Sequence, residues 1–221
     1  MDAVIEARNV LIGGFWVNIQ LFAASSLLML IVSFAAGLAR LSGSRTVRGV
    51  AAVYVNLFRG TSLVVQLFWL YYALPMLGIR LEAFPAAVIG LGLCFGAYAS
   101  EVVRAGLLAV GSGQREAALA LNMTRTQIFA RVLMPQAIVV MLPGYTNLLI
   151  LLLQATAAAS LITLQELTFR AGSLNAVTFN TAPIFLTVLV AYFLFAQAVA
   201  RALRELERRL AFWRWPRART A

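Results

Sequence analysis

The chain has 221 residues, of which 62% are hydrophobic and 12% charged, and its mean hydropathy is +0.87. Soluble domains carry about 45–50% apolar and about 25% charged residues, so this composition excludes a soluble globular fold of this size. The sequence contains no histidine or lysine, and Asp2 and Cys94 are single occurrences. These absences exclude a Ser-His-Asp triad, a two-histidine zinc site and a P-loop, which needs a lysine. We therefore expect a membrane protein that is not an enzyme and binds no metal or cofactor itself.

Five apolar stretches have the length that a helix needs to cross the hydrocarbon core, which is about 20 residues. They cover 14–39, 61–79, 84–109, 136–156 and 183–203. The start of the second stretch is open, because Arg59 and Gly60 separate it from the apolar run 50–58. That run is either an interfacial helix or the first part of a broken span. The sequence thus predicts an all-α integral membrane domain over 1–221 with about five transmembrane helices.

Charged residues between these stretches divide unevenly between the two sides of the membrane. One side receives 40–59, 101–131 and the tail from 201, with 15 arginines and four glutamates, whereas the other side has a net charge of −1. Basic residues stay on the cytoplasmic side, so we expect the N-terminus outside and the C-terminus in the cytoplasm. The tail mixes arginine with Trp213 and Trp215, which favours contact with anionic lipid over binding of nucleic acid.

The loop at about 111–133, between the third and fourth stretches, is rich in alanine and predicts two short helices. The first covers 114–121 and places Glu116 in its first turn, where a carboxylate faces the positive end of the helix dipole. The second begins at Thr124, whose spacing to the glutamine three residues later fits a capping box. Asn122 lies between them and tolerates the left-handed conformation that ends a helix. Such a helical pair is either a docking surface or a solvated connector.

The same loop resembles the EAA motif of ABC-importer permeases, in which Gly follows EAA after three residues and Leu-Pro comes further on. The matching residues are Glu116, Ala117, Ala118, Asn122, Met134 and Pro135. Asn122 replaces the usual Gly, and Met134 replaces the usual Leu. Segments of the polar amino-acid branch resemble three more stretches: NLFRGTS at 56–62, FGAYASEVVRAG at 95–106 and RVLMPQA at 131–137. The chain is identified by this resemblance with the histidine, glutamine and arginine permease type, to which ectoine uptake permeases are similar.

The resemblance implies the type I ABC-importer permease fold in the inner membrane of a bacterial cell. Such a permease forms the translocation path, while a pair of separate ATPase subunits, which bind ATP and Mg²⁺, docks on the EAA helices. A substrate-binding protein delivers the substrate, which the resemblance implies is a polar amino acid. An amino-acid-like compatible solute such as ectoine is the alternative substrate. The alternative of another class is an ion-coupled carrier, for which Glu101 is the one candidate proton relay within a span.

Six residues are candidates for the substrate path, and a structural role is open for each of them. They are Arg59, Tyr98, Glu101, Arg104, Gln154 and Thr156. Glu101 and Arg104 lie three apart on one helix face, so they either neutralise each other near lipid or act in gating. Gln154 and Thr156 either contact neighbouring helices or contact substrate. Similar permeases commonly carry Lys-Asp where this chain has Gln154 and Ala155, which favours a second, different permease as partner over a homodimer.

Overall fold

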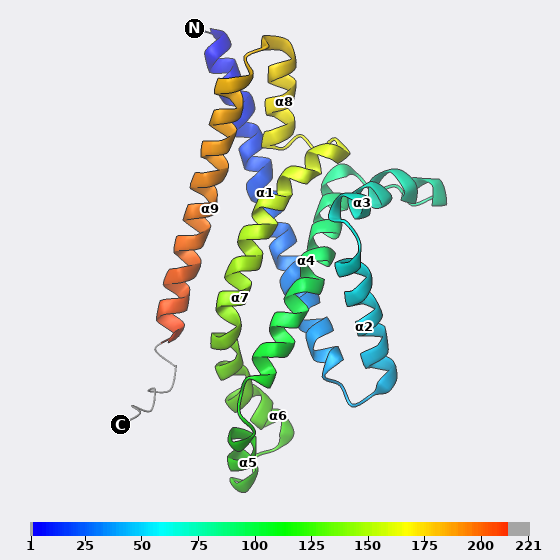
Figure 1. Ribbon diagram of the computed structural model, residues 1–221, viewed down its shortest axis with the longest axis vertical. Helices are drawn as coiled ribbons and strands as arrows, with labels where there is room; N and C mark the ends of the chain where they lie inside the picture. The colour runs from blue at the N-terminus through cyan, green and yellow to red at the C-terminus, as the bar shows by residue number, and fades with distance from the viewer. Residues whose placement is uncertain (1, 212–221) are drawn as a thin grey trace.

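The computed structural model describes residues 2–211, and within this range all regular secondary structure is helical. Helix α1 (Asp2–Arg40) runs along most of the molecule and packs along α4 (Ala83–Leu108). Helix α7 (Met134–Ala155) packs on α4, and α9 (Thr181–Ala211) lies beside α7 at the edge (Figure 1). The tryptophans expected to contact lipid, Trp213 and Trp215, fall outside the described residues.

Small residues allow α1 and α4 to approach closely, as they commonly do between helices in membranes. A Cβ added to Gly37 of α1 would lie 2.9 Å from the backbone oxygen of Ser100 in α4. Gly92 and Gly96 of α4 face side chains of α1 in the same way. The core between α1, α4 and α7 is built from larger apolar side chains: Leu21, Met29, Leu91, Phe95, Val103, Met141 and Tyr145.

Four helices are long and apolar enough to span a membrane, and a bent helix pair brings the number to as many as five among the described residues. The four cover Asn9–Arg40, Ala83–Leu108, Arg125–Ile162 and Thr181–Leu210. The third of these begins inside the loop 111–133, because Thr124 starts a helix that continues through a π-helical turn, Ile128–Leu133, into α7. The second short helix of the loop is therefore the first part of a spanning helix.

The bent pair consists of α2 (Arg45–Gly60) and a segment from Leu63 to Leu77, which meet at 104°. This segment starts as α3 (Leu63–Phe68) and continues as a π turn and a 3-10 turn. The chain breaks because Thr61 adopts an extended conformation. Gln66 holds the bend, since its Nε2 donates to the Phe58 oxygen at 2.9 Å and to the Thr61 hydroxyl at 2.7 Å. The expected stretch 61–79 is thus one arm of a bent element whose other arm contains 50–58.

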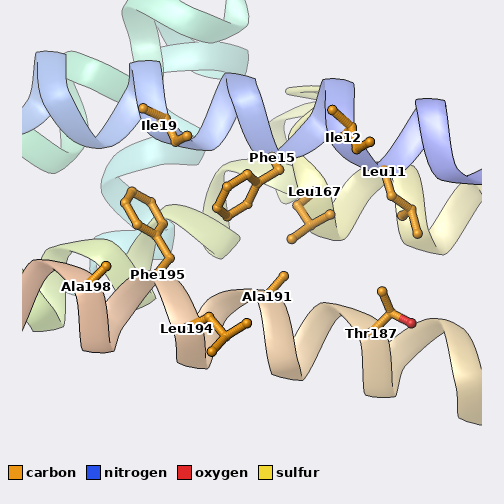
Figure 2. A pocket seen from close by; sticks show the side chains of 10 residues that line it. All are labelled: Leu11, Ile12, Phe15, Ile19, Leu167, Thr187, Ala191, Leu194, Phe195 and Ala198. Carbon is orange, nitrogen blue, oxygen red and sulfur yellow. The ribbon is translucent and has the colours of Figure 1, made fainter.

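Helix α8 (Leu167–Thr178) lies at the end of the molecule opposite the short helices α5 (Ser112–Ala120) and α6 (Arg125–Gln127) (Figure 1). Near α8, an apolar cavity of about 620 Å³ separates α1 from α9, and Figure 2 shows the side chains around it. Phe15 and Phe195 in its lining contact each other edge to face, with ring centroids 5.4 Å apart. The single hydroxyl in its lining, that of Thr187, donates to the Pro183 oxygen at 2.8 Å. This lining offers no polar group for a hydrophilic substrate.

Candidate functional site

The first short helix of the loop, α5 (Ser112–Ala120), lies with α6 (Arg125–Gln127) at one extreme end of the molecule (Figure 1). Glu116 and Ala117 are exposed on α5, while Ala118 is only 3% exposed. Ala118 belongs to the side of α5 that packs toward the π turn Ile128–Leu133, which leads into α7. The exposed face of α5 is therefore presented on a helix that is fixed from behind.

One expectation for this helix is wrong. The helix begins at Ser112 rather than at residue 114, because the extended backbone of Gly111 caps it two residues earlier. Glu116 consequently lies in the second turn, outside the first turn where the helix dipole acts most strongly. Its exposure, rather than its interaction with the helix dipole, is the property that suits it to contact another protein.

The junction after α5 follows the sequence prediction closely. Asn122 has a positive φ of 56°, the left-handed conformation that asparagine tolerates. The predicted capping box at Thr124 is confirmed: its backbone N–H donates to Gln127 Oε1 at 2.9 Å, and its hydroxyl accepts from the Gln127 N–H. Met134 and Pro135 begin α7 directly after the π turn Ile128–Leu133, inside the continuous helix that starts after Thr124. The six EAA-motif residues thus lie in and just after one connected helical unit.

The predicted pairing of Glu101 with Arg104 is confirmed, with Arg104 Nε 3.0 Å from Glu101 Oε1. Sequence reasoning missed a third member, Arg40, which pairs with the other oxygen of Glu101 from the last turn of α1. Each of the three side chains is about one-fifth to one-third exposed. The sequence does show a basic residue, Arg40, at the end of the first apolar stretch. It gave no reason to pair Arg40 with Glu101, because the two lie 61 residues apart.

A cavity of about 460 Å³ opens where the bend after α2 meets α4 and α7. Its lining residues are Thr61, Ser62, Leu63, Cys94, Phe95, Tyr98, Leu148 and Leu151. Arg59, at the end of α2, places its guanidinium carbon 5.3 Å from the centre of the Tyr98 ring. The structure therefore brings together two of the predicted substrate-path residues, Arg59 and Tyr98, beside a cavity with both polar and apolar walls.

Gln154 and Thr156 lie elsewhere, toward α8 and α9. Gln154 lines a separate cavity of about 480 Å³ together with Thr168 and Tyr192. Thr156 is 1% exposed, and its hydroxyl donates to the Leu153 oxygen at 2.7 Å. The six candidates therefore fall into three groups. Arg59 and Tyr98 lie at the bend, Glu101 and Arg104 are ion-paired near the end of α1, and Gln154 and Thr156 lie near α8.

The structure also reveals a buried carboxylate that sequence reasoning missed, Glu166, directly before α8. It accepts hydrogen bonds from the backbone N–H groups of Thr168 and Phe169 and from the Tyr192 hydroxyl, at 2.8–3.0 Å. Asn18 of α1 donates to the same hydroxyl at 2.7 Å. Burial raises the pKa of the Glu166 carboxyl above its usual value, and these hydrogen bonds oppose that rise. The one local signal for Glu166 in the sequence was its position directly before a helix, where an acidic side chain can cap the first backbone N–H groups.

These features define a class of protein: an all-helical membrane subunit with an exposed helix between two of its spanning segments and a cavity at a broken span. The chain belongs to the family of inner membrane components of binding-protein-dependent transport systems, whose model matches residues 16–212. It is therefore a transport subunit of the ABC type and not an enzyme, and it functions in the inner membrane. Membership implies an ATPase subunit and a substrate-binding protein as partners.

Individual relatives agree with this assignment. A probable amino-acid ABC transporter permease of Sinorhizobium fredii is 41% identical over 207 residues, covering 91% of this chain and 87% of that protein. The L-cystine transport system permease of Bacillus subtilis is 37% identical, covering 91% of this chain and 86% of that protein. The crystal structure of an amino acid ABC transporter with histidines matches with a TM-score of 0.86 at 30% identity, covering 93% and 96%. The likeness over nearly the whole length confirms the type I importer permease fold.

Proposed function

We propose that this chain is the permease subunit of an uptake system for a polar amino acid, with α5 as the surface on which the ATPase docks. The observation that carries the proposal is the exposed Glu116-Ala117 face of α5, at the end of the molecule opposite α8. The permeases named above, which are related over nine-tenths of this chain, support an amino acid as the substrate. ATP and Mg²⁺ are bound by the ATPase, since this chain lacks the lysine of a P-loop.

The coupling role of α5 is tested by Glu116→Lys. We expect the variant to assemble with the ATPase and hydrolyse ATP, but to lose at least ten-fold in substrate uptake, because the charge reversal lies on the docking face. The matched control is Glu205→Lys, the same reversal at an exposed site of α9. Uptake by Glu116→Lys at the level of this control would remove α5 from the coupling step.

We further infer that the chain faces a second, different permease in the membrane. The inference rests on the neutral residues Gln154 and Ala155, where similar permeases commonly carry Lys-Asp, because a zwitterion that leaves water needs charged or strongly polar partners. A partner chain with its own polar set provides them. The test is to tag this chain, express it with its ATPase and any neighbouring permease, and weigh the purified complex. Substrate-stimulated ATPase activity from a complex with two copies of this chain and no other permease contradicts it.

A further inference from the structure

The cavity at the bend between α2 and α3 has one cationic group beside it, the guanidinium of Arg59. This group is exposed and forms no ion pair within residues 2–211, where the three ion pairs found involve other arginines. It lies over the ring of Tyr98, with 5.3 Å from the guanidinium carbon to the ring centre. A guanidinium held over an aromatic face keeps the N–H donors that point away from the ring free to hold a carboxylate by two hydrogen bonds.

The hydroxyl groups around the cavity are not equivalent. The Thr61 hydroxyl donates to the Leu57 oxygen and accepts from Gln66, so its single O–H is already used and cannot donate to a ligand. The hydroxyls of Ser62 and Tyr98 also border the cavity, and Tyr98 is 38% exposed. These two residues therefore bring further hydroxyl donors to the cavity that Arg59 lies beside.

No residue of the cavity lining is acidic, so the lining offers no anionic partner for a cationic side chain. The carboxylate nearest along α4, that of Glu101, lies one turn beyond Tyr98 and is already paired with Arg40 and Arg104. The remaining walls are apolar, from side chains such as Leu148 and Leu151 of α7. The charge at this site is consequently positive, while the walls suit an uncharged side chain.

We propose that Arg59, with the Ser62 and Tyr98 hydroxyls, binds the carboxylate of an amino acid whose side chain carries no positive charge. The proposal rests on the proposed import of amino acids and assigns the class of amino acid that this chain accepts. Arg59 supplies the opposite charge, the two hydroxyls supply hydrogen bonds, and the apolar wall receives the side chain. A cationic amino acid would place its second positive charge beside Arg59 without a carboxylate to balance it.

The test is equilibrium binding of radiolabelled amino acids to the detergent-purified complex of this chain with its ATPase and partner permease, without the binding protein. The probes are L-glutamine, L-leucine, L-cystine and L-arginine, each measured separately. We expect at least one uncharged probe to bind and L-arginine to bind at least ten-fold more weakly. A competitor that lacks the carboxylate, the amine obtained by decarboxylating the best probe, should fail to displace it. Equal or tighter binding of L-arginine, displacement by the decarboxylated amine, or binding of none of the probes overturns the proposal.

Two variants separate a binding role from a structural one. Arg59→Gln should weaken binding of the best probe at least ten-fold, whereas the matched control Arg80→Gln, at an exposed arginine away from the cavity, should leave it unchanged. Tyr98→Phe keeps the ring under the guanidinium and should weaken binding several-fold through loss of the hydroxyl. Unchanged binding in Arg59→Gln overturns the assignment. Stimulation of ATPase activity by the loaded binding protein, measured on the same preparations, reports the import function separately from this charge preference.

Discussion

The guanidinium of Arg40, in the last turn of α1, pairs with the carboxylate of Glu101 in the middle of the second half of α4. The other oxygen of that carboxylate accepts from Arg104, so one acidic group is shared by two arginines. The pairing joins the two most extensively packed helices at the end of the molecule that also carries α5. Unpaired charge near a membrane is costly, which gives this shared carboxylate a structural function.

Removing the charge of Glu101 should destabilise the protein. Glu101→Gln leaves Arg40 and Arg104 without their counter-charge, and we expect a loss of about 1–2 kcal/mol, allowing for the partial exposure of all three groups. That corresponds to a Tm lower by roughly 2–8 °C for a chain of this size. The measurement is thermal unfolding of the purified protein in detergent. Glu205→Gln is the control, because its pair with Arg209 is 52–77% exposed and should contribute little; equal shifts in both variants would contradict the structural role.

The close approach of α1 to α4 predicts opposite effects for the same substitution at two glycines. Gly37→Ala would place a Cβ 2.8 Å from the Cβ of Val103 and 2.9 Å from a backbone oxygen that cannot move easily. We expect a loss of about 1–3 kcal/mol from overpacking. Gly49→Ala, in the second turn of α2, meets nothing within 4 Å and should be neutral or stabilise the helix by about 0.5–1 kcal/mol. Thermal unfolding of both variants checks the prediction, and a Gly37→Ala protein as stable as the wild type would refute the close packing.

The buried carboxyl of Glu166 predicts a dependence of stability on pH. Its pKa is raised in the folded protein, mainly by burial, above the ordinary value of 4.5. Between the two values the folded chain holds a proton that the unfolded chain has released, so raising the pH favours unfolding over that window. We expect the Tm to fall as the pH rises from about 4.5, and Glu166→Gln to flatten this slope. An exposed acid, as in Glu116→Gln, serves as the control; a slope that persists in Glu166→Gln would assign it to another group.

Local features of this chain could be predicted from the sequence because neighbouring residues determine them. The capping box at Thr124, the left-handed backbone of Asn122 and the pairing of Glu101 with Arg104 each depend on residues within four positions of one another. The first-turn position of Glu116 was predicted wrongly, although it is also local, because Gly111 starts α5 earlier than the alanine pattern indicates.

Features that depend on distant parts of the chain were not predictable in this way. Arg40 meets Glu101 across 61 residues, and Asn18 meets Tyr192 across 174. The 104° bend between α2 and α3 is held by hydrogen bonds from the Gln66 side chain. The periodicity of the apolar residues does not indicate this role of Gln66. The same bend brings Arg59 over Tyr98, so the candidate substrate cavity could be located only once the fold was known.

The orientation of the chain in the membrane remains a prediction from charge, and single-cysteine labelling tests it. In the sequence, fifteen arginines and four glutamates fall in the segments 40–59, 101–131 and the tail from 201, whereas the other segments have a net charge of −1. Because basic loops stay in the cytoplasm, α5 should lie inside the cell and the turn between α8 and α9 outside. The chain suits this experiment, since its one cysteine, Cys94, is 4% exposed and should react slowly.

We expect Asn180→Cys, at the exposed turn before α9, to react with a membrane-impermeant maleimide added to intact spheroplasts. Gly113→Cys, at the exposed start of α5, should react only after the membrane is opened or in inverted vesicles. The unsubstituted chain measures the background from Cys94. Labelling of Gly113→Cys from outside intact cells, with Asn180→Cys protected, would reverse the orientation. It would also place α5 on the wrong side of the membrane for an ATPase, so the docking role proposed for Glu116 would fall with it.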